Sequence, residues 1–415
     1  MSFAYRNGVL CAEGVPLDVI ARRFGTPCYV YSRAAIESAY SEFIRALEGR
    51  DALVCYSVKA NSNLGVLALL ARLGAGFDIV SGGELARVIA AGGDPCKTLF
   101  SGVGKTEVEI EFALARDIAC INLESEAELE RVASIAKRLG RRAPIAFRVN
   151  PDVDAGTHPY ISTGMRENKF GIAHADAQRL YMRAAGMPEL EVVGIGCHIG
   201  SLLVEAAPFI AAAERLVMLV DRLEAAGVRL RHIDVGGGIG IRYKDETPQP
   251  IAAFVRGALS VVGKRRQTLI FDPGRSIVGN AGLLLTRVEY VKPGAARNFL
   301  VVDAAMNDLI RAPLYDAWHD VKSVRETEAG AADAVYDVVG PICESADFLA
   351  RERRLAAQAG DLLAVLSAGA YGMSMSSNYN SRPRAAEVLV EGDAARLVRR
   401  RESIGELFAA EQLPD

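Results

Sequence analysis

The sequence predicts an α/β protein: a (β/α)8 TIM barrel followed by a mostly β C-terminal domain of the barrel or sandwich type. The first observation is a repeated pattern between residues 29 and 282, in which a short apolar, β-branched run precedes an amphipathic helical stretch. The second is that these runs are nearly continuous in Val, Ile and Leu, which is typical of parallel strands covered on both faces. The third is that the repeats occupy about 250 residues, the usual length of a (β/α)8 barrel.

The candidate strands follow one another along the first part of the chain. They are Leu53–Val58, Phe77–Val80, Thr98–Phe100, Ile118–Asn122, Pro144–Val149, Val192–Cys197, His232–Val235 and Leu269–Phe271. Helical segments lie between them, with apolar residues three and four positions apart. They include Leu64–Leu73, Gly83–Ala91, Ser125–Leu139 and Ala207–Ala225. Because periodicity alone cannot show that a sheet closes, a doubly wound open sheet stays open as the alternative fold.

The pattern changes after residue 282, where strand-like runs are joined by turns and loops with little helix between them. These runs are Leu283–Val291, Phe299–Val302, Ala334–Val339, Asp361–Leu366 and Glu387–Val390. The first residues of the chain also contain a short strand-like piece. We therefore expect residues 29–282 to form the barrel and residues 1–28 with 283–415 to form the β domain.

Composition and charge exclude several classes of protein. Half of the 415 residues are hydrophobic and 24% are charged, so the chain can bury a large core and is not disordered. The 48 Lys and Arg against 51 Asp and Glu leave no basic surplus for nucleic acid or an acidic membrane. The seven cysteines lack Cys-x-x-Cys spacing and the five histidines lack metal-ligand spacing, so neither a disulfide framework nor a metal site is expected. With no secretion-signal pattern and no apolar run long enough to span a membrane, we expect a soluble, cytoplasmic protein.

Chemically active residues follow directly after several of the predicted strands. The strand ends carry Lys59, Arg148-Val149-Asn150, His198-Ile199-Gly200-Ser201, Gly236–Gly240 and Asp272-Pro273-Gly274-Arg275. In a parallel barrel the carboxyl ends of all strands face one rim, where the loops build the active site. A lysine, a histidine, an arginine, a carboxylate and a glycine-rich turn should therefore converge there, although they lie far apart in the chain.

Two of these residues have ordinary alternatives. Most lysines are solvated surface charges, but Lys59 comes straight after a buried run, and partial desolvation favours use of the amine as a nucleophile or in a Schiff base. A lone histidine is more often a residue of the core, but His198 stands beside Gly200-Ser201 at a strand end. We interpret both side chains as functional.

The turn Gly236–Gly238 could be no more than a tight turn. Exposed backbone N–H groups after a strand nevertheless bind anions, and barrels commonly hold a phosphate after strands seven and eight. The spacing lacks the dinucleotide fingerprint, so the anion is not expected to belong to a nucleotide of that type. An amine, a phosphate site and a carboxylate are what pyridoxal phosphate requires, and Lys59, Gly236–Gly238 and Asp272 could supply them.

At these residues the sequence resembles the alanine-racemase-type barrel family of pyridoxal-phosphate enzymes, and within it the branch that decarboxylates diaminopimelate. The likeness extends along nearly the whole chain. It includes Tyr56–Asn61, Thr157–Gly164, Asn168–Gly171, His198–Ser201, Pro273–Ser276, Met306–Arg311, Cys343–Ser345 and Tyr379–Arg382. The lysine, histidine and glycine motifs are shared with ornithine- and arginine-type decarboxylases, whereas Thr157–Gly164, Asn168–Gly171 and Met306–Arg311 are more particular to the diaminopimelate branch.

The resemblance implies a role for each matching residue. Lys59 would hold the cofactor as a Schiff base, His198 would stack on its ring, and Asp272 would meet its ring nitrogen. The phosphate would be bound by Ser201, Gly236, Gly237, Gly238, Gly274 and Arg275. The retained carboxylate of the substrate would be bound by Arg275, Arg311 and Tyr315. Cys343 would return a proton to the α-carbon, Glu344 would bind the distal ammonium, and Tyr371 would lie near phosphate and substrate. The family usually has Glu where this chain has Asp272, so the carboxylate is one methylene shorter; either the backbone lies closer to the ring nitrogen, or the contact is long or bridged by water.

The resemblance also implies the reaction and the assembly. The reaction would be the conversion of meso-2,6-diaminopimelate to L-lysine and carbon dioxide, the last step of lysine biosynthesis. The assembly would be a homodimer in which Cys343 and Glu344 reach the partner's barrel. Three alternatives stay open: a decarboxylase of ornithine or arginine, a racemase on the same barrel, and a non-catalytic relative that carries the cofactor. Ornithine and arginine have no distal carboxylate, so they match a site containing Arg311 and Tyr315 less well than diaminopimelate does.

Overall fold

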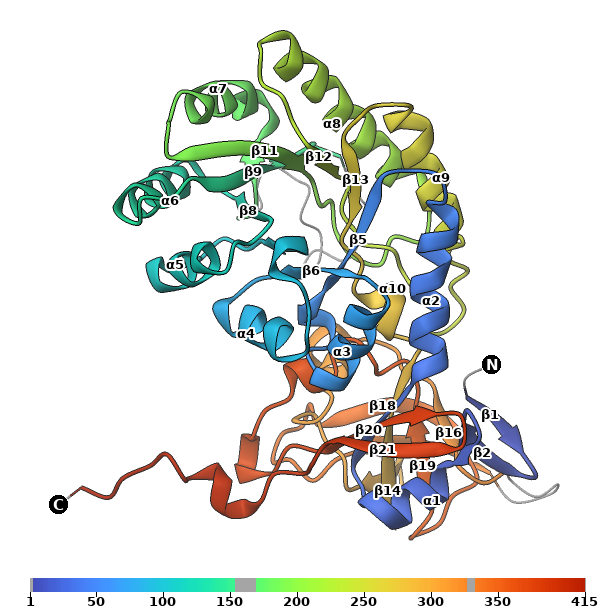
Figure 1. Cartoon of the computed structure of the whole chain (residues 1–415). Helices are drawn as coiled ribbons and strands as arrows, with labels where there is room; N and C mark the ends of the chain where they lie inside the picture. The colour runs from blue at the N-terminus through green and yellow to red at the C-terminus, as the bar shows by residue number, and fades with distance from the viewer. Residues whose placement is uncertain (1–2, 154–168, 327–332, 415) are drawn as a thin grey trace. The chain divides into compact units, whose positions relative to one another are not determined.

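The computed structural model describes residues 3–153, 169–326 and 333–414 (Figure 1). The chain forms two units. Residues 39–241 and 247–276 make up one, here called the barrel unit, and residues 1–38, 242–246 and 277–415 make up the other, called the β unit. The Thr157–Gly164 motif and Asn168 lie outside the described residues.

Eight parallel strands form the centre of the barrel unit (Figure 1). They are β5 (Ala52–Ser57), β6 (Gly76–Ile79), β7 (Thr98–Phe100), β8 (Cys120–Leu123), β9 (Ala143–Asn150), β11 (Leu190–Gly196), β12 (His232–Asp234) and β13 (Thr268–Phe271). Neighbouring strands pair in parallel, and the pairs β13–β5 and β8–β9 close the ring. A short strand, β10 (Ile172–Ala173), pairs with β9 beside the ring. The predicted (β/α)8 barrel is confirmed, and the open sheet is excluded.

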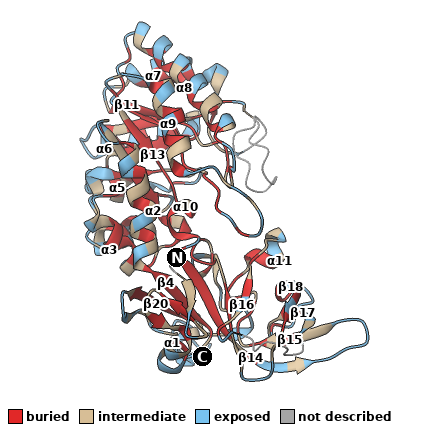
Figure 2. Cartoon of the chain, turned by 90° about the vertical axis from the view of Figure 1, so that its right-hand side faces the viewer, coloured by how far each residue is buried: buried red, intermediate tan, exposed pale blue. Residues whose placement is uncertain are grey.

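Helices follow the strands around the ring. They are α2 (Arg33–Ala46), α3 (Leu64–Arg72), α4 (Gly82–Ala90), α5 (Glu107–Ala115), α6 (Glu126–Arg138), α7 (His174–Ala185), α8 (Ala207–Ala225), α9 (Ile251–Val262) and the short α10 (Arg275–Val278), with 3-10 turns η1 (Val58–Ala60) and η2 (Pro95–Lys97). Helix α6 shows why these segments are helical. The Ser125 hydroxyl accepts the Glu128 N–H at its first turn, and Leu129 and Val132 are buried on one face. Figure 2 shows the same division throughout the barrel unit, with buried strands and exposed outer helix faces.

Apolar side chains fill part of the barrel interior. The buried cluster consists of Cys55, Leu99, Cys120, Ala146, Val193 and Ile270. Burial raises the pKa of the Cys55 thiol well above its ordinary value, so this cysteine behaves as a small apolar residue. The interior is therefore packed, and only the strand ends are available for chemistry.

The β unit consists mainly of strands. Its larger sheet contains β4 (Cys28–Ser32), β14 (Gly282–Lys292), β15 (Asn298–Val302), β16 (Val321–Ser323), β17 (Ala334–Val339), β18 (Phe348–Leu355), β19 (Leu362–Val365), β20 (Ala386–Glu391) and β21 (Ala394–Arg399). A smaller sheet contains β1 (Phe3–Arg6), β2 (Val9–Ala12) and β3 (Val15–Pro16). Short helical pieces are α1 (Leu17–Phe24), α11 (Arg311–Tyr315), η3 (Met373–Met375), η4 (Tyr379–Ser381) and η5 (Ile404–Leu407). The predicted mostly β second domain is confirmed.

Strand β4 shows how the beginning of the chain joins the β unit. It pairs antiparallel with β14 and parallel with β20. Its Tyr29 phenol donates to the Asp308 carbonyl oxygen at 2.6 Å, and its Tyr31 phenol donates to Glu387 Oε1 at 2.8 Å. Both tyrosines are fully buried, so these bonds satisfy polar groups inside the core and fix the Asp308 segment against the sheet.

Candidate active site

A cavity of about 480 Å³ lies within the barrel unit at the carboxyl ends of the strands. Its polar lining includes Lys59, Asp78, Arg148, His198, Asp234 and Asp272. These residues come from β5, β6, β9, β11, β12 and β13 or from the residues directly after them. The structure thus brings together the lysine, the histidine and the carboxylate that the sequence analysis selected.

The Lys59 ammonium is held by a buried carboxylate. Lys59 lies in the 3-10 turn after β5, and its Nζ donates to Asp78 Oδ2 at 3.0 Å. Asp78 is buried on β6 and also accepts hydrogen bonds from the hydroxyls of Ser57 and Ser101 at 3.1 and 2.6 Å. Burial raises the pKa of this carboxyl, but the Lys59 charge and the three hydrogen bonds outweigh it, so the pKa is lowered overall. Asp78 therefore stays ionised and fixes the amine at the rim of the cavity.

Asp78 was not selected from the sequence. Its signal is a single charged residue within the apolar run Gly76-Phe77-Asp78-Ile79 of β6, the strand next to β5, where Asp78 pairs in register with Ser57. A carboxylate buried in a strand is rare unless it is paired. This rarity is the sequence signal that could have identified Asp78 as a candidate site residue.

Two further carboxylates, Asp234 and Asp272, line the cavity together with His198. His198 Nδ1 lies 3.3 Å from Asp272 Oδ1, an ion-pair contact when the imidazole is protonated, and no hydrogen bond from the described residues reaches this buried oxygen. Asp234 lies nearby, and its Oδ1 accepts the Gly236 N–H at 2.9 Å. Burial and the Asp272 charge raise the pKa of Asp234 well above its ordinary value. Asp234 is thus the member of the pair that holds a proton, while the Asp272 side chain lies against His198.

The glycine turn after β12 has little room for side chains. Gly236 and Gly238 have φ of +85° and +75°, a region that favours glycine. A Cβ on Gly238 would lie 2.2 Å from the Gly200 carbonyl oxygen, and one on Gly237 would lie 2.5 Å from the Asp272 carbonyl oxygen. The turn can therefore form only with glycines, which leave its backbone uncovered.

The loop after β13 lies against the Lys59-bearing turn. A Cβ on Gly274 would lie 3.0 Å from the Ala60 Cβ, so this glycine permits the close approach. Arg275 is buried, and its Nε donates to the Ser201 hydroxyl at 3.4 Å. Ser201 and Arg275, predicted together for the phosphate, thus lie side by side.

Arg148 lies near the carboxyl end of β9, and the sequence alone predicts no role for it. Its guanidinium lines the cavity, lies 3.5 Å from Glu124 Oε1, and donates to the His198 carbonyl oxygen at 3.3 Å. Glu124 also accepts the Gly102 N–H at 3.0 Å and the Gly171 N–H at 2.7 Å. This carboxylate therefore ties three loops of the rim together through one buried group.

The remaining predicted site residues lie in the β unit. They are Arg311 and Tyr315 in α11, Cys343 and Glu344 between β17 and β18, and Tyr371 after β19. Arg311 is buried, its Nη1 lies 2.9 Å from His319 Nε2, and its guanidinium lies over the Tyr243 ring. Cys343 and Glu344 are exposed on their loop. Tyr371 has φ of +56°, which is uncommon for an aromatic residue.

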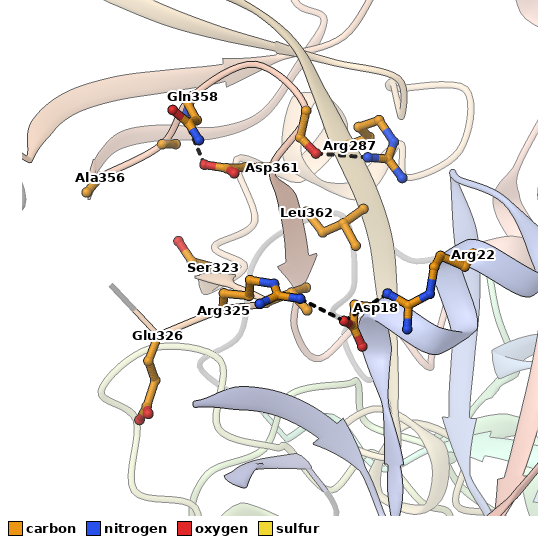
Figure 3. A pocket seen from close by; sticks show the side chains of 13 residues that line it. Asp18, Arg22, Arg287, Ser323, Arg325, Glu326, Ala356, Gln358, Asp361 and Leu362 are labelled. Atoms are coloured by element: carbon orange, nitrogen blue, oxygen red, sulfur yellow. Dashed lines mark hydrogen bonds and ion pairs between the residues drawn. The ribbon is translucent and has the colours of Figure 1, made fainter. Parts of the chain in front are cut away.

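A second cavity, of about 620 Å³, lies in the β unit and contains none of the predicted site residues (Figure 3). Asp18 pairs there with Arg22 at 3.1 Å and with Arg325 at 3.2 Å. Arg287 donates to the Gly360 carbonyl oxygen at 2.8 Å. Since these guanidinium groups already contact acceptors, the cavity is a poor match for a phosphate.

Within the described residues there is no group of three or more His, Cys, Asp or Glu side chains placed to hold a metal ion. In the same part of the chain, no helix combines the length and the apolar composition that crossing a membrane requires.

The closed barrel, its lysine-bearing cavity and the separate β unit define a pyridoxal-phosphate-dependent decarboxylase of the barrel type. The family described as "Pyridoxal-dependent decarboxylase, pyridoxal binding domain" matches residues 33–279, which include every residue that lines the cavity. The protein is therefore a carboxy-lyase whose cofactor is pyridoxal phosphate.

Within this class the chain belongs to the diaminopimelate decarboxylases. It is 61% identical to the diaminopimelate decarboxylase of Pseudomonas fluorescens over 99% of both chains, and 54% identical to that of Vibrio cholerae over 98% of this chain and 97% of the other. Among solved structures, that of the Helicobacter pylori diaminopimelate decarboxylase complexed with L-lysine has a TM-score of 0.92 at 41% identity, over 95% of this chain and 99% of that one. The M. jannaschii diaminopimelate decarboxylase in co-complex with L-lysine has a TM-score of 0.94 at 35% identity, over 100% and 98% of the two chains.

Proposed function

We propose that the rim cavity of the barrel unit binds pyridoxal phosphate and that the chain converts meso-2,6-diaminopimelate to L-lysine and carbon dioxide there. The observation that carries this is the Lys59 amine, held 3.0 Å from the buried Asp78 carboxylate in the same cavity as His198 and Asp272. The relatives reported above are named as diaminopimelate decarboxylases. Two of the similar solved structures contain L-lysine, which is the product of the proposed reaction.

The residues present fit this cofactor. No hydrogen bond from the described residues reaches the buried Asp272 Oδ1, although His198 Nδ1 lies 3.3 Å away, so this oxygen can still accept a pyridinium N–H. The glycine turn would be filled by any Cβ, as expected of a cradle for phosphate oxygens. Bound pyridoxal phosphate supplies an electron sink for the pair left when the carboxylate departs.

Each residue of the barrel unit then has a task. Lys59 would bind the cofactor covalently through Nζ, and Asp78 would hold the amine when it is released. His198 would cover one face of the ring, and Asp272 would meet the ring nitrogen. The phosphate would be bound by Ser201, Gly236, Gly237, Gly238, Gly274 and Arg275.

The substrate would be recognised mainly by residues of the β unit. Arg311 and Tyr315, with Arg275, would bind the carboxylate that is kept, since a guanidinium fork matches a carboxylate. Glu344 would bind the ammonium beside that carboxylate, and Tyr371 would lie near it. Cys343 would give a proton to the α-carbon, because a thiol is mostly protonated near neutral pH. For the functional division of the chain we propose residues 29–282 as the cofactor-binding part and residues 1–28 with 283–415 as the β part.

The substrate assignment is tested by supplying the purified holoenzyme separately with meso-diaminopimelate, ornithine and arginine. We expect carbon dioxide and L-lysine from meso-diaminopimelate, and turnover of the other two lower by about a hundredfold or more, because neither carries a carboxylate at the retained end to meet Arg311. Released gas and amine products are measured for each substrate. Comparable turnover of ornithine would favour the other decarboxylase type, and racemisation without gas would favour a racemase.

We further propose that the protein is a cytoplasmic homodimer in which Cys343 and Glu344 complete the active site of the partner. Co-expressed Lys59→Ala and Cys343→Ala chains with different tags should then form doubly tagged dimers that keep one intact site of two. We expect these dimers to have about half of the wild-type activity, whereas each variant alone is inactive. Light scattering gives the mass, and inactive doubly tagged dimers would contradict shared sites.

A further inference from the structure

The segment Tyr379–Arg382 has no task in the reaction described above, although it forms a motif in the sequence. It lies in the β unit, where Tyr379–Ser381 forms η4. Asn380 has φ of +54°, a left-handed conformation that Asn adopts more readily than most residues. At one end the Ser377 N–H donates to the Asn307 carbonyl oxygen at 2.9 Å, and at the other Arg382 Nη2 donates to the Asp303 carbonyl oxygen at 2.6 Å. The segment is therefore fixed to the chain that leads into α11.

This segment contacts the two residues to which substrate roles are assigned. The Tyr379 hydroxyl donates to Glu344 Oε1, and the Cys343 N–H donates to Asn380 Oδ1 at 3.1 Å. The hydrogen bond and the charge of Glu344 raise the pKa of the Tyr379 phenol, which therefore remains a donor at neutral pH. Tyr379 and Asn380, which are consecutive in one loop, thus form hydrogen bonds with Glu344 and Cys343, which are consecutive in the other.

The loop of Cys343 is also held from its buried side. Asp347 is buried, and its two oxygens accept the Met306 and Ile342 N–H groups, each at 2.7 Å. Burial raises the pKa of this carboxyl. Because Asp347 already fixes the backbone of the loop, the Tyr379 bond is not needed for folding and restrains mainly the exposed Glu344 side chain.

We propose that Tyr379 and Asn380 are positioning residues for substrate recognition and proton delivery. Tyr379 restrains the Glu344 carboxylate so that it faces the ammonium of the retained end of the substrate, and Asn380 fixes the backbone that carries the Cys343 thiol. An exposed glutamate otherwise samples several rotamers, and restraining it before binding reduces the entropy lost when substrate is bound. The inference rests on the proposed roles of Glu344 and Cys343.

The Tyr379 part is tested on the holoenzyme with Tyr379→Phe, which removes one hydroxyl. We expect KM for meso-diaminopimelate to rise about tenfold, because a charge-assisted hydrogen bond is lost, while kcat stays within about twofold. Glu344→Gln should raise KM similarly, and the double variant should add little to either. Tyr290→Phe is the matched control, because Tyr290 is an exposed tyrosine on β14 away from this loop.

Competitive inhibition separates positioning from a general structural role. L-lysine carries the ammonium that Glu344 would bind, whereas 6-aminohexanoate has the same chain and carboxylate without it. Tyr379→Phe should weaken inhibition by L-lysine about tenfold and leave 6-aminohexanoate unchanged. If Glu344→Gln loses the preference for L-lysine while Tyr379→Phe keeps it, the inference fails and the role of Glu344 stands. If neither variant changes it, the role of Glu344 fails as well.

The Asn380 part is tested with a pair of variants. Asn380→Gly keeps the left-handed backbone and removes the acceptor, so kcat should fall by about fivefold with little change in KM. Asn380→Asp keeps an acceptor oxygen and should retain kcat. Equal kcat for Asn380→Gly and the wild type would overturn this part of the inference.

Discussion

Replacing Lys59 with alanine is expected to lower kcat by about 10⁴-fold or more, because the covalent route through the cofactor is lost. The purified variant should also lack the absorbance of a cofactor bound to a lysine. The wild-type protein, treated with borohydride and digested, should carry the reduced label on the peptide that contains Lys59. Activity, absorbance and peptide mapping measure the three expectations separately.

A second variant, Lys59→Arg, distinguishes the loss of the covalent bond to the cofactor from a loss of folding stability. Lys59 forms an ion pair with the buried Asp78, so alanine leaves that carboxylate without its cation. Lys59→Arg keeps a cation opposite Asp78, but a guanidinium remains protonated and cannot form the covalent bond. We expect Lys59→Arg to unfold at nearly the wild-type denaturant concentration and to be as inactive as Lys59→Ala. Lys97→Ala, at an exposed lysine, should behave as wild type. Label found on another lysine would overturn the assignment.

Much of the barrel and of its site could be predicted because both depend on local signals. Continuous apolar runs identify buried parallel strands, and the closed barrel places the residues after them at one rim. Lys59, His198 and Asp272 could therefore be grouped without any knowledge of distances. What could not be predicted locally is how their polar neighbours pair. Asp78 and Asp234 lie within predicted strands, and hydrophobic periodicity identifies the strand but does not predict the partner of a charged residue inside it.

The β unit was less predictable because its strands pair over long distances. The apolar run of β4 is recognisable as a strand, but only packing decides that it joins β14 and β20 and not the barrel. Strand β18, Phe348–Leu355, contains four charged residues among eight and was not among the predicted strands. One of them, Arg353, is buried with its guanidinium over the Trp318 ring. The hydrophobic pattern of the sequence predicts such a charged residue on the surface, so it could not identify this strand.

Replacing Asp272 with asparagine is expected to lower kcat by about 10²- to 10³-fold, because the ring nitrogen would lose the charge that stabilises the electron-rich state of the reaction. The cofactor should remain bound, since Lys59 and the glycine turn are untouched. Asp272→Glu keeps the charge and carries the residue that the family usually has, so its kcat should stay within about tenfold of wild type. Kinetics and the absorbance of the bound cofactor are measured for both variants, with Asp221→Asn, on the exposed side of α8, as the control.

The outcome also decides between the two carboxylates of the cavity. Burial and the Asp272 charge raise the pKa of Asp234 well above its ordinary value, so Asp234 is the member of the pair that holds a proton. In Asp272→Asn that charge is gone, and Asp234 becomes easier to ionise although it remains buried. If kcat of Asp272→Asn stays within about threefold of wild type, Asp272 is not the partner of the ring nitrogen. Adding Asp234→Asn to Asp272→Asn should then show the large loss, because Asp234 is a second buried carboxylate of the cavity and can ionise once the Asp272 charge is gone.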